Sequence, residues 1–266
     1  MDTVTIGGIE VSRFILGSNP FSGFSHQTVE RNREMVHYYN CENIKKLLRE
    51  AETLGINTVI GRGDHHMQRV LMEYWDQGGT LQWFGQTCPE LGPPEKTLSL
   101  LHAAGSPASH IHGGYTDHLM ENGELEKLKP TVEYARKLGM TIGCAGHIAE
   151  TIRWVRDNLD VDYYMCSYYN PIPRKVSAEH QAGYEEMYLE EDRQAMLEVI
   201  RTLTKPVIHY KVLAAGRHDP REALPFVVDQ MRPGDTVCVG IFAKDNPRML
   251  AEDVDIFVEA LAATTA

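Results

Sequence analysis

The chain has 266 residues and a formal net charge of −11 at pH 7. This length suits one eight-stranded α/β barrel of roughly 250 residues, so we expect a single domain over residues 1–266. The acidic balance, without a long Lys/Arg cluster, excludes a nucleic-acid-binding footprint. No apolar run approaches the ~20 residues that span a bilayer, and the N-terminus lacks the features of a signal peptide. A cytoplasmic protein with a small-molecule substrate is therefore expected, with its five scattered cysteines reduced.

The first predicted element is a β-hairpin. In TVTIGGIEVSRF (3–14), apolar and polar residues alternate around a Gly-Gly pair, which is a hairpin signal. After it, short apolar runs bounded by turn residues alternate with longer amphipathic stretches. That alternation is typical of βα units whose parallel strands are buried on both faces.

Eight strands are predicted, at residues 14–17, 58–61, 81–85, 109–112, 141–144, 163–166, 207–210 and 236–240. The predicted helices span about 42–54, 66–77, 94–104, 123–138, 148–159, 189–203, 219–230 and 246–262. Strict alternation predicts a closed (β/α)8 TIM barrel, with the hairpin, residues 1–13, plugging its bottom. An open doubly wound sheet is the competing arrangement.

Two connections are longer than turns. Residues 18–41 follow the first barrel strand, and residues 171–188 follow the sixth. Both leave the carboxyl ends of strands, where barrel enzymes build their active sites. We therefore predict that the two loops form a lid over the substrate.

Five segments in chain order carry a family resemblance. They are GGIEVSRFILGSNPFSG (7–23), LGINTVIGRGDHH (54–66), SYYNP (167–171), HYKVLAAGR (209–217) and GIFAKDNPRMLAEDV (240–254). Together they resemble the hairpin, second unit, sixth strand, seventh strand with its loop, and last strand with its helix of the aldo-keto reductases. The resemblance implies that family's barrel, with NADPH as the expected cofactor for carbonyl reduction.

The resemblance also implies a catalytic tyrosine supported by a lysine, an aspartate and a histidine. In this chain, Ile60 occupies the position of the family's aspartate and His65 that of its tyrosine. Gln86 occupies the position of the lysine, and only His112 matches the family's histidine. The catalytic set of the family is thus largely replaced.

The cofactor side of the resemblance is altered as well. Ala145 and Gly146 stand where the family has a Ser-Asn pair for the carboxamide. Tyr210 matches the tyrosine that stacks on nicotinamide, and Lys244 with Arg248 are the candidates to meet a phosphate.

Four histidines lie at or just past the ends of the second, fourth, fifth and seventh predicted barrel strands, namely His65, His112, His147 and His209. Because strand ends converge at one barrel mouth, we predict that they meet there. Imidazole ligands suit zinc, iron, nickel or manganese. The main hypothesis is therefore a metal-assisted lyase, isomerase or hydrolase acting on a small oxygen-rich metabolite such as a sugar, polyol or keto acid.

Catalysis without a metal is also open. His65 with His112 could exchange protons as general acid and base. Lys211 could form a Schiff base, bind a substrate anion, or pair with an acidic loop residue. Arg62 could clamp a carboxylate, or bridge loops through Asp64. The further alternatives are an NAD(P)H-dependent oxidoreductase in which His65 replaces the tyrosine, and a non-catalytic ligand-binding barrel.

Overall fold

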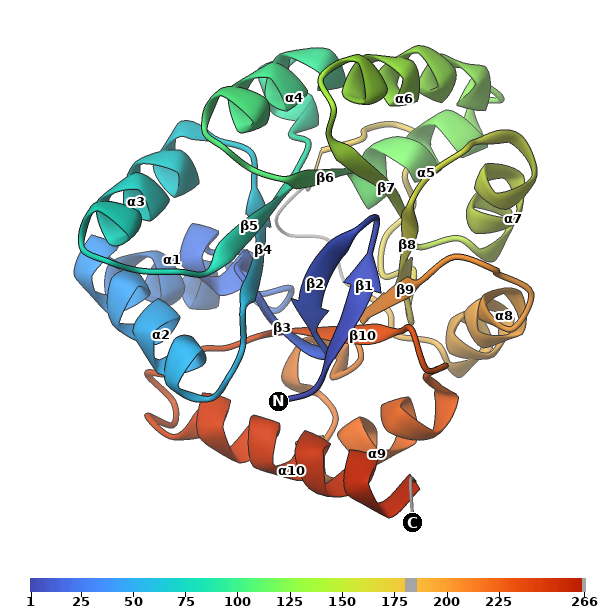
Figure 1. Ribbon diagram of the computed structural model, residues 1–266. Helices are drawn as coiled ribbons and strands as arrows, with labels where there is room; N and C mark the ends of the chain where they lie inside the picture. Colours follow the sequence, from blue (N-terminus) through green and yellow to red (C-terminus); the bar gives the residue numbers. More distant parts are fainter. Residues whose placement is uncertain (180–185, 265–266) are drawn as a thin grey trace.

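The computed structural model describes residues 1–179 and 186–264. Eight parallel strands close into a barrel in the order β10-β3-β4-β5-β6-β7-β8-β9, and the helices surround it as an outer ring (Figure 1). The strands are β3 (Phe14–Gly17), β4 (Thr58–Arg62), β5 (Gln82–Gln86), β6 (Ala108–Ile111), β7 (Thr141–Gly146), β8 (Tyr163–Ser167), β9 (Val207–Tyr210) and β10 (Thr236–Gly240). The closed barrel is confirmed over the open sheet.

The outer helices follow the apolar spacing of the sequence. In α2, for example, Ile44, Leu47 and Leu48 face the barrel, and the Asn40 side chain caps the helix by accepting a hydrogen bond from the Asn43 N–H. The helices are α1 (Val29–Tyr38), α2 (Cys41–Thr53), α3 (His65–Asp76), α4 (Pro94–Ala103), α5 (Gly113–Glu121), α6 (Leu128–Lys137), α7 (Ala149–Asn158), α8 (Glu190–Ile200), α9 (Pro220–Gln230) and α10 (Met249–Thr264).

The N-terminal hairpin closes one end of the barrel. Strands β1 (Thr3–Ile6) and β2 (Ile9–Ser12) pair antiparallel and lie in front of the barrel opening in Figure 1. Ile6 and Val11 of the hairpin pack with Phe84 and Tyr163 of the barrel interior. The predicted hairpin plug is therefore confirmed, and the site must lie at the opposite mouth.

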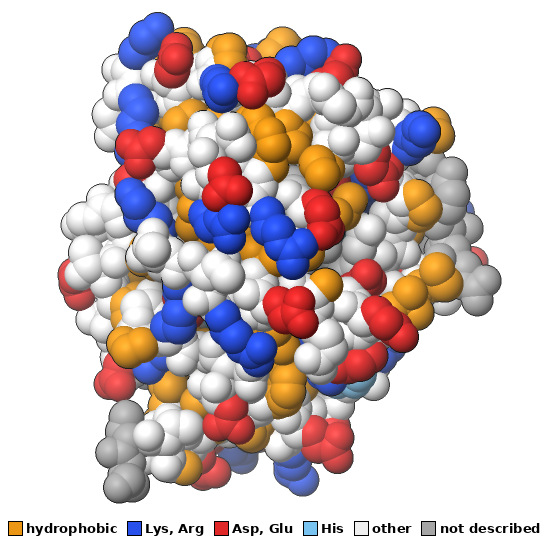
Figure 2. Space-filling view, turned by 90° about the vertical axis from the view of Figure 1, so that its right-hand side faces the viewer, with side chains coloured by type: hydrophobic (Ala, Val, Ile, Leu, Met, Phe, Trp, Pro, Cys, Tyr) orange, Lys and Arg blue, Asp and Glu red, His pale blue; other side chains and the backbone are white. Residues whose placement is uncertain are grey.

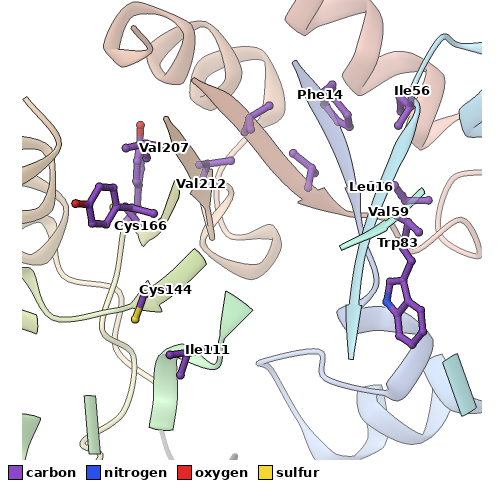
Figure 3. Close-up of a cluster of buried hydrophobic side chains, with 14 of the residues drawn as sticks. Phe14, Leu16, Ile56, Val59, Trp83, Ile111, Cys144, Cys166, Val207 and Val212 are labelled. Atoms are coloured by element: carbon purple, nitrogen blue, oxygen red, sulfur yellow. The ribbon is translucent and has the colours of Figure 1, made fainter. Parts of the chain in front are cut away.

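Strand side chains alternate between two apolar layers. The inner layer fills the barrel with side chains such as Ile15, Phe84 and Ile208. The outer layer packs between barrel and helices; Figure 3 shows part of it, including Phe14 and Trp83. This parity decides which residues of each strand can reach the mouth, since a neighbouring position points into the opposite layer.

Two helices were not predicted. Helix α1 lies inside the connection 18–41, and α5 follows β6 directly. Only Met35 of α1 is buried. The helix therefore lacks the repeating apolar positions by which an amphipathic helix is recognised in a sequence. The predicted helix 123–138 is divided into a 3-10 turn, η3 (Leu125–Lys127), and α6. The described parts of the predicted lid loop 171–188 contain no helix or strand, and residues 180–185 of that prediction lie outside the described residues.

The surface is charged but mixed. On the face shown in Figure 2, Lys and Arg side chains are interspersed with Asp and Glu. Among the described residues, no helix is both long and apolar enough to cross a membrane.

Candidate functional site

Two adjoining cavities open at the barrel mouth opposite the hairpin. The larger has a volume of about 380 Å³ and runs from the barrel centre between the loops that follow β9 and β10. The smaller, of about 160 Å³, lies over the ends of β6 and β7. Both cavities are lined by Asn19, Phe24, His26, Arg62, Gln86, Tyr210 and Lys211. A ligand in one cavity would therefore meet a ligand in the other at these residues.

His112 lies in the smaller cavity and caps helix α5. Its Nδ1 accepts a hydrogen bond from the Tyr115 N–H at 3.2 Å, so the neutral ring carries its hydrogen on Nε2. Burial, reinforced by the charges of Arg174 and other neighbouring cations, lowers the pKa of His112 well below 6.5. At neutral pH this imidazole is uncharged and offers one N–H to a ligand.

Tyr210 ends β9 and belongs to a buried relay. Its hydroxyl lies 3.2 Å from Nε2 of His147, and Nδ1 of the same imidazole lies 2.7 Å from a carboxylate oxygen of Asp117. Asp117 also accepts a hydrogen bond from the His147 backbone N–H at 2.9 Å, and burial raises its pKa to about 7. With Asp117 ionised, His147 donates from Nδ1 and accepts the Tyr210 hydroxyl proton at Nε2. The relay thus fixes the Tyr210 ring at the junction of the cavities.

Lys211 follows Tyr210 in a left-handed backbone conformation, with φ of 57°. This conformation is uncommon for a residue with a side chain and occurs where neighbouring structure enforces it. Its Nζ lies 3.0 Å from Nε2 of His26, whose Nδ1 lies 2.9 Å from Glu186. Burial lowers the pKa of Lys211 from 10.5 to about 8. The amine therefore changes protonation near physiological pH while His26 keeps it oriented.

Arg174 is a further charged group of the smaller cavity. Its side chain comes from the loop after β8 and the residue is only 4% exposed. Its guanidinium donates to the backbone oxygen of Glu179 at 3.1 Å. Over residues 1–179 and 186–264, no carboxylate lies within ion-pairing distance of it. A buried cation without a counter-ion is costly, which makes Arg174 a candidate ligand-binding residue.

Of the two roles predicted for Arg62, a carboxylate clamp or a bridge between loops, its contacts favour the bridge. It lines both cavities, but its guanidinium is 2.9 Å from Asp64 and is also paired with Glu90. Because two carboxylates already neutralise it, Arg62 bridges loops. A ligand carboxylate would find less free charge there than at Arg174.

The predicted cluster of four histidines does not form. His112 and His147 do line the smaller cavity. His65 is exposed in the first turn of α3, and His209 is fully buried in the outer layer against Tyr168 and Asp235. His209 points outward because Ile208 and Tyr210 occupy the inward positions of β9. Among the described residues, no three His, Cys, Asp or Glu side chains are grouped as metal ligands would be. The position of His65 also leaves its predicted acid-base role without a contact to either cavity.

The two predicted phosphate ligands lie beside the larger cavity and do not line it. Lys244 is 2.7 Å from Glu34, and Arg248 is 3.8 Å from Glu252. The cavity is lined by two carboxyl groups, Asp245 and Asp253 of α10, and by the basic residues Arg31, Arg62 and Lys211. Asp253 is 3% exposed, has no hydrogen-bond partner among the described residues, and has a pKa raised by burial to about 7.

Several site residues were missed by sequence reasoning. Arg174 and Asp117 stand alone in segments without a periodic pattern, and His26 was not among the predicted site residues. The Gly-Gly pair after His112 was the available signal, because a Cβ on Gly113 would lie 2.9 Å from the Tyr210 hydroxyl. Because glycine has no Cβ, other side chains can approach its backbone closely, as they do where several side chains surround a binding site.

No family model and no curated protein matches the chain. Solved structures do match it. A protein from Pseudomonas aeruginosa assigned to the aldo-keto reductases shares 20% identity and a TM-score of 0.65, covering 97% of this chain and 96% of its own. This chain has the aldo-keto reductase fold. The holo form of an aldo-keto reductase from Bacillus halodurans matches at 10% identity, a TM-score of 0.58 and 98% and 96% coverage. A variant of the protein Gox0644 in complex with NADPH matches at 12% identity, a TM-score of 0.58 and 98% and 92% coverage.

Proposed function

We propose that this chain is an oxidoreductase that reduces the carbonyl group of a small substrate, or oxidises the corresponding alcohol. The larger cavity would hold a nicotinamide cofactor and the smaller cavity the substrate. The observation that carries the proposal is the junction of the two cavities, where Tyr210 and Lys211 line both. His112 faces the same smaller cavity as a hydrogen-bond donor. These side chains support the proposal, because one fold can host many different activities.

The larger cavity fits a nicotinamide nucleotide at both ends. Around the barrel centre, Tyr210 and the small Ala145 leave room for a planar ring. At the far end, the unpartnered Asp253 carboxyl is suited to accept hydrogen bonds from ribose hydroxyls. Lys244 and Arg248 are each paired with a glutamate, and Arg31, which lines the cavity, is paired with Glu34 and Asp245. An additional 2′-phosphate is therefore disfavoured, and NADH should bind more tightly than NADPH.

When bound, the nicotinamide would supply a hydride to a carbonyl carbon or accept one from an alcohol. His112 donates its Nε2 hydrogen to the substrate oxygen and stabilises the negative charge that develops there. Because its pKa is so low, His112 polarises the oxygen without transferring the proton.

Lys211 is the group that transfers the proton. With a pKa of about 8, its ammonium can protonate the alkoxide oxygen in reduction, and its neutral amine can take the hydroxyl proton in oxidation. Tyr210 cannot replace it, since its hydroxyl proton is engaged by His147. The proposed general acid is therefore Lys211, in the loop after β9, in place of the predicted His65.

The test is fluorescence titration of the purified protein with NADH and, separately, NADPH. Both are expected to bind, NADH with the lower Kd. Tyr210→Ala should weaken NADH binding at least tenfold, because the ring loses its stacking surface. Tyr134→Ala, which removes a tyrosine on the outer helix α6, is the matched control and should leave the Kd unchanged. No binding of either cofactor at millimolar concentration would overturn the proposal.

A further inference from the structure

The smaller cavity concentrates positive charge in an otherwise acidic protein. Arg174 and Lys211 both line it, and neither is ion-paired within the part of the chain that the structure describes. Arg62, the remaining arginine of this cavity, is neutralised by Asp64 and Glu90. Buried Arg174 and half-buried Lys211 are thus left facing one cavity of about 160 Å³.

A helix N-terminus adds to this charge. Helix α5 begins at Gly113, at the end of β6, and its first N–H groups have no acceptor within the helix. Because Gly114 has no side chain, Arg174 can approach the N-terminus of α5. A Cβ at Gly114 would lie 3.0 Å from Cζ of Arg174 and 2.8 Å from Cε1 of His112. The absence of a side chain therefore keeps the guanidinium, the imidazole and the helix end around one space.

We propose that this space is a carboxylate subsite, in which Arg174, assisted by Lys211 and the N-terminus of α5, binds the acid group of a 2-oxo or 2-hydroxy carboxylate. A planar guanidinium matches a carboxylate in bidentate geometry. The carbonyl or hydroxyl carbon next to that acid group then lies beside His112 and Lys211. The reacting position rests on the proposed function, whereas the binding of the anion does not.

The lining of the cavity favours a small carboxylate over a phosphate. It includes Glu90 and Glu179, which repel a dianion more strongly than a monoanion. Arg174 has no counter-ion among residues 1–179 and 186–264, and the cost of burying it is offset once a carboxylate binds. This cost also explains why the arginine is useful to the site and not to the stability of the fold.

The test is isothermal titration calorimetry of the cofactor-free protein with lactate and with lactamide, which differ in charge but little in size. Lactate is expected to bind at least tenfold more tightly than lactamide. Arg174→Gln should abolish this preference, whereas Arg153→Gln, the same charge change on the outer helix α7, should preserve it. Equal affinity for the two compounds would overturn the inference, as would tighter binding of inorganic phosphate than of lactate.

A stability measurement separates a binding role from a structural one. Because Arg174 has no carboxylate partner within the described residues, Arg174→Gln should leave the Tm unchanged or raise it while lactate binding is lost. A lowered Tm, together with unchanged lactate binding, would show a structural arginine and overturn the inference. If lactate binds but neither NADH nor NADPH does, the subsite stands and the oxidoreductase proposal fails. If a nicotinamide cofactor binds but lactate does not, the reverse holds.

Discussion

At the scale of single residues, the site depends on side chains whose ordinary chemistry is changed by burial. Burial keeps His112 uncharged and lowers the pKa of Lys211 to about 8. The alternation of side chains along each strand decides which residues reach the site. In β9, His209 packs in the outer layer, whereas the next residue, Tyr210, reaches the barrel mouth. The sequence analysis predicted His209 in the site because the ends of a strand do not reveal which of its side chains point inward.

Burial of Lys211 predicts a dependence of stability on pH. The folded state lowers the pKa of Lys211 from 10.5 to about 8, so between these values the unfolded chain binds more protons. The free energy of unfolding should therefore rise from pH 8 to pH 10.5, by about 2 to 3 kcal/mol from this group. Lys211→Met should lack this rise in urea denaturation, whereas Lys205→Met, an exposed lysine, should keep it. Identical pH profiles for wild type and Lys211→Met would contradict the assigned environment.

At the scale of elements, the barrel is held at its hairpin end by a side chain that joins two strands. Asp235 precedes β10, and its Oδ1 accepts a hydrogen bond from the Val207 N–H at the start of β9, at 2.9 Å. Its Oδ2 accepts the backbone N–H of Arg232 at 2.9 Å, and the Arg232 guanidinium lies 2.8 Å from Oδ1. These contacts fix the relation of β9, which carries Tyr210, to its neighbour.

Replacing Asp235 should therefore loosen the barrel. Although burial acts in the opposite direction, Arg232 holds the pKa of Asp235 well below its usual range. Asp235→Ala should cost about 2 to 4 kcal/mol at pH 7, because a buried N–H and a cation lose their acceptor. The difference from wild type should shrink as the pH falls below about 4, where the unfolded carboxylate becomes protonated. Urea denaturation at several pH values measures this. Asp229→Ala, at an exposed position of α9, should change stability little at any pH.

At the scale of the whole molecule, stability and binding are separated along the barrel axis. The hairpin closes one end (Figure 1). Both cavities open at the other end. Ile6 of the hairpin is fully buried against the barrel interior. Ile6→Ala should cost about 2 to 4 kcal/mol in urea denaturation through the cavity it leaves. The Kd for lactate should not change at temperatures where the variant is folded, and a large change in that Kd would mean that the two ends are coupled.

The sequence by itself determined the barrel. Buried parallel strands need continuous apolar runs, and the intervening helices need a 3.6-residue period, so their alternation is visible locally. The predicted bounds of β3, β9 and β10 agree with the structure, and those of the other strands differ by one or two residues at one or both ends. The amphipathic outer helices were found for the same reason, whereas the polar α1 was not.

Only the tertiary structure decided the site. Arg174, His26 and Glu186 come from loops whose path no periodic pattern reveals, and Asp117 lies on a helix that was not predicted. His65, which sequence position placed at the mouth, turns to solvent on α3. Local chemistry sets which elements form, but the identity of the groups that meet depends on strand parity and loop path, which the closure of the barrel fixes.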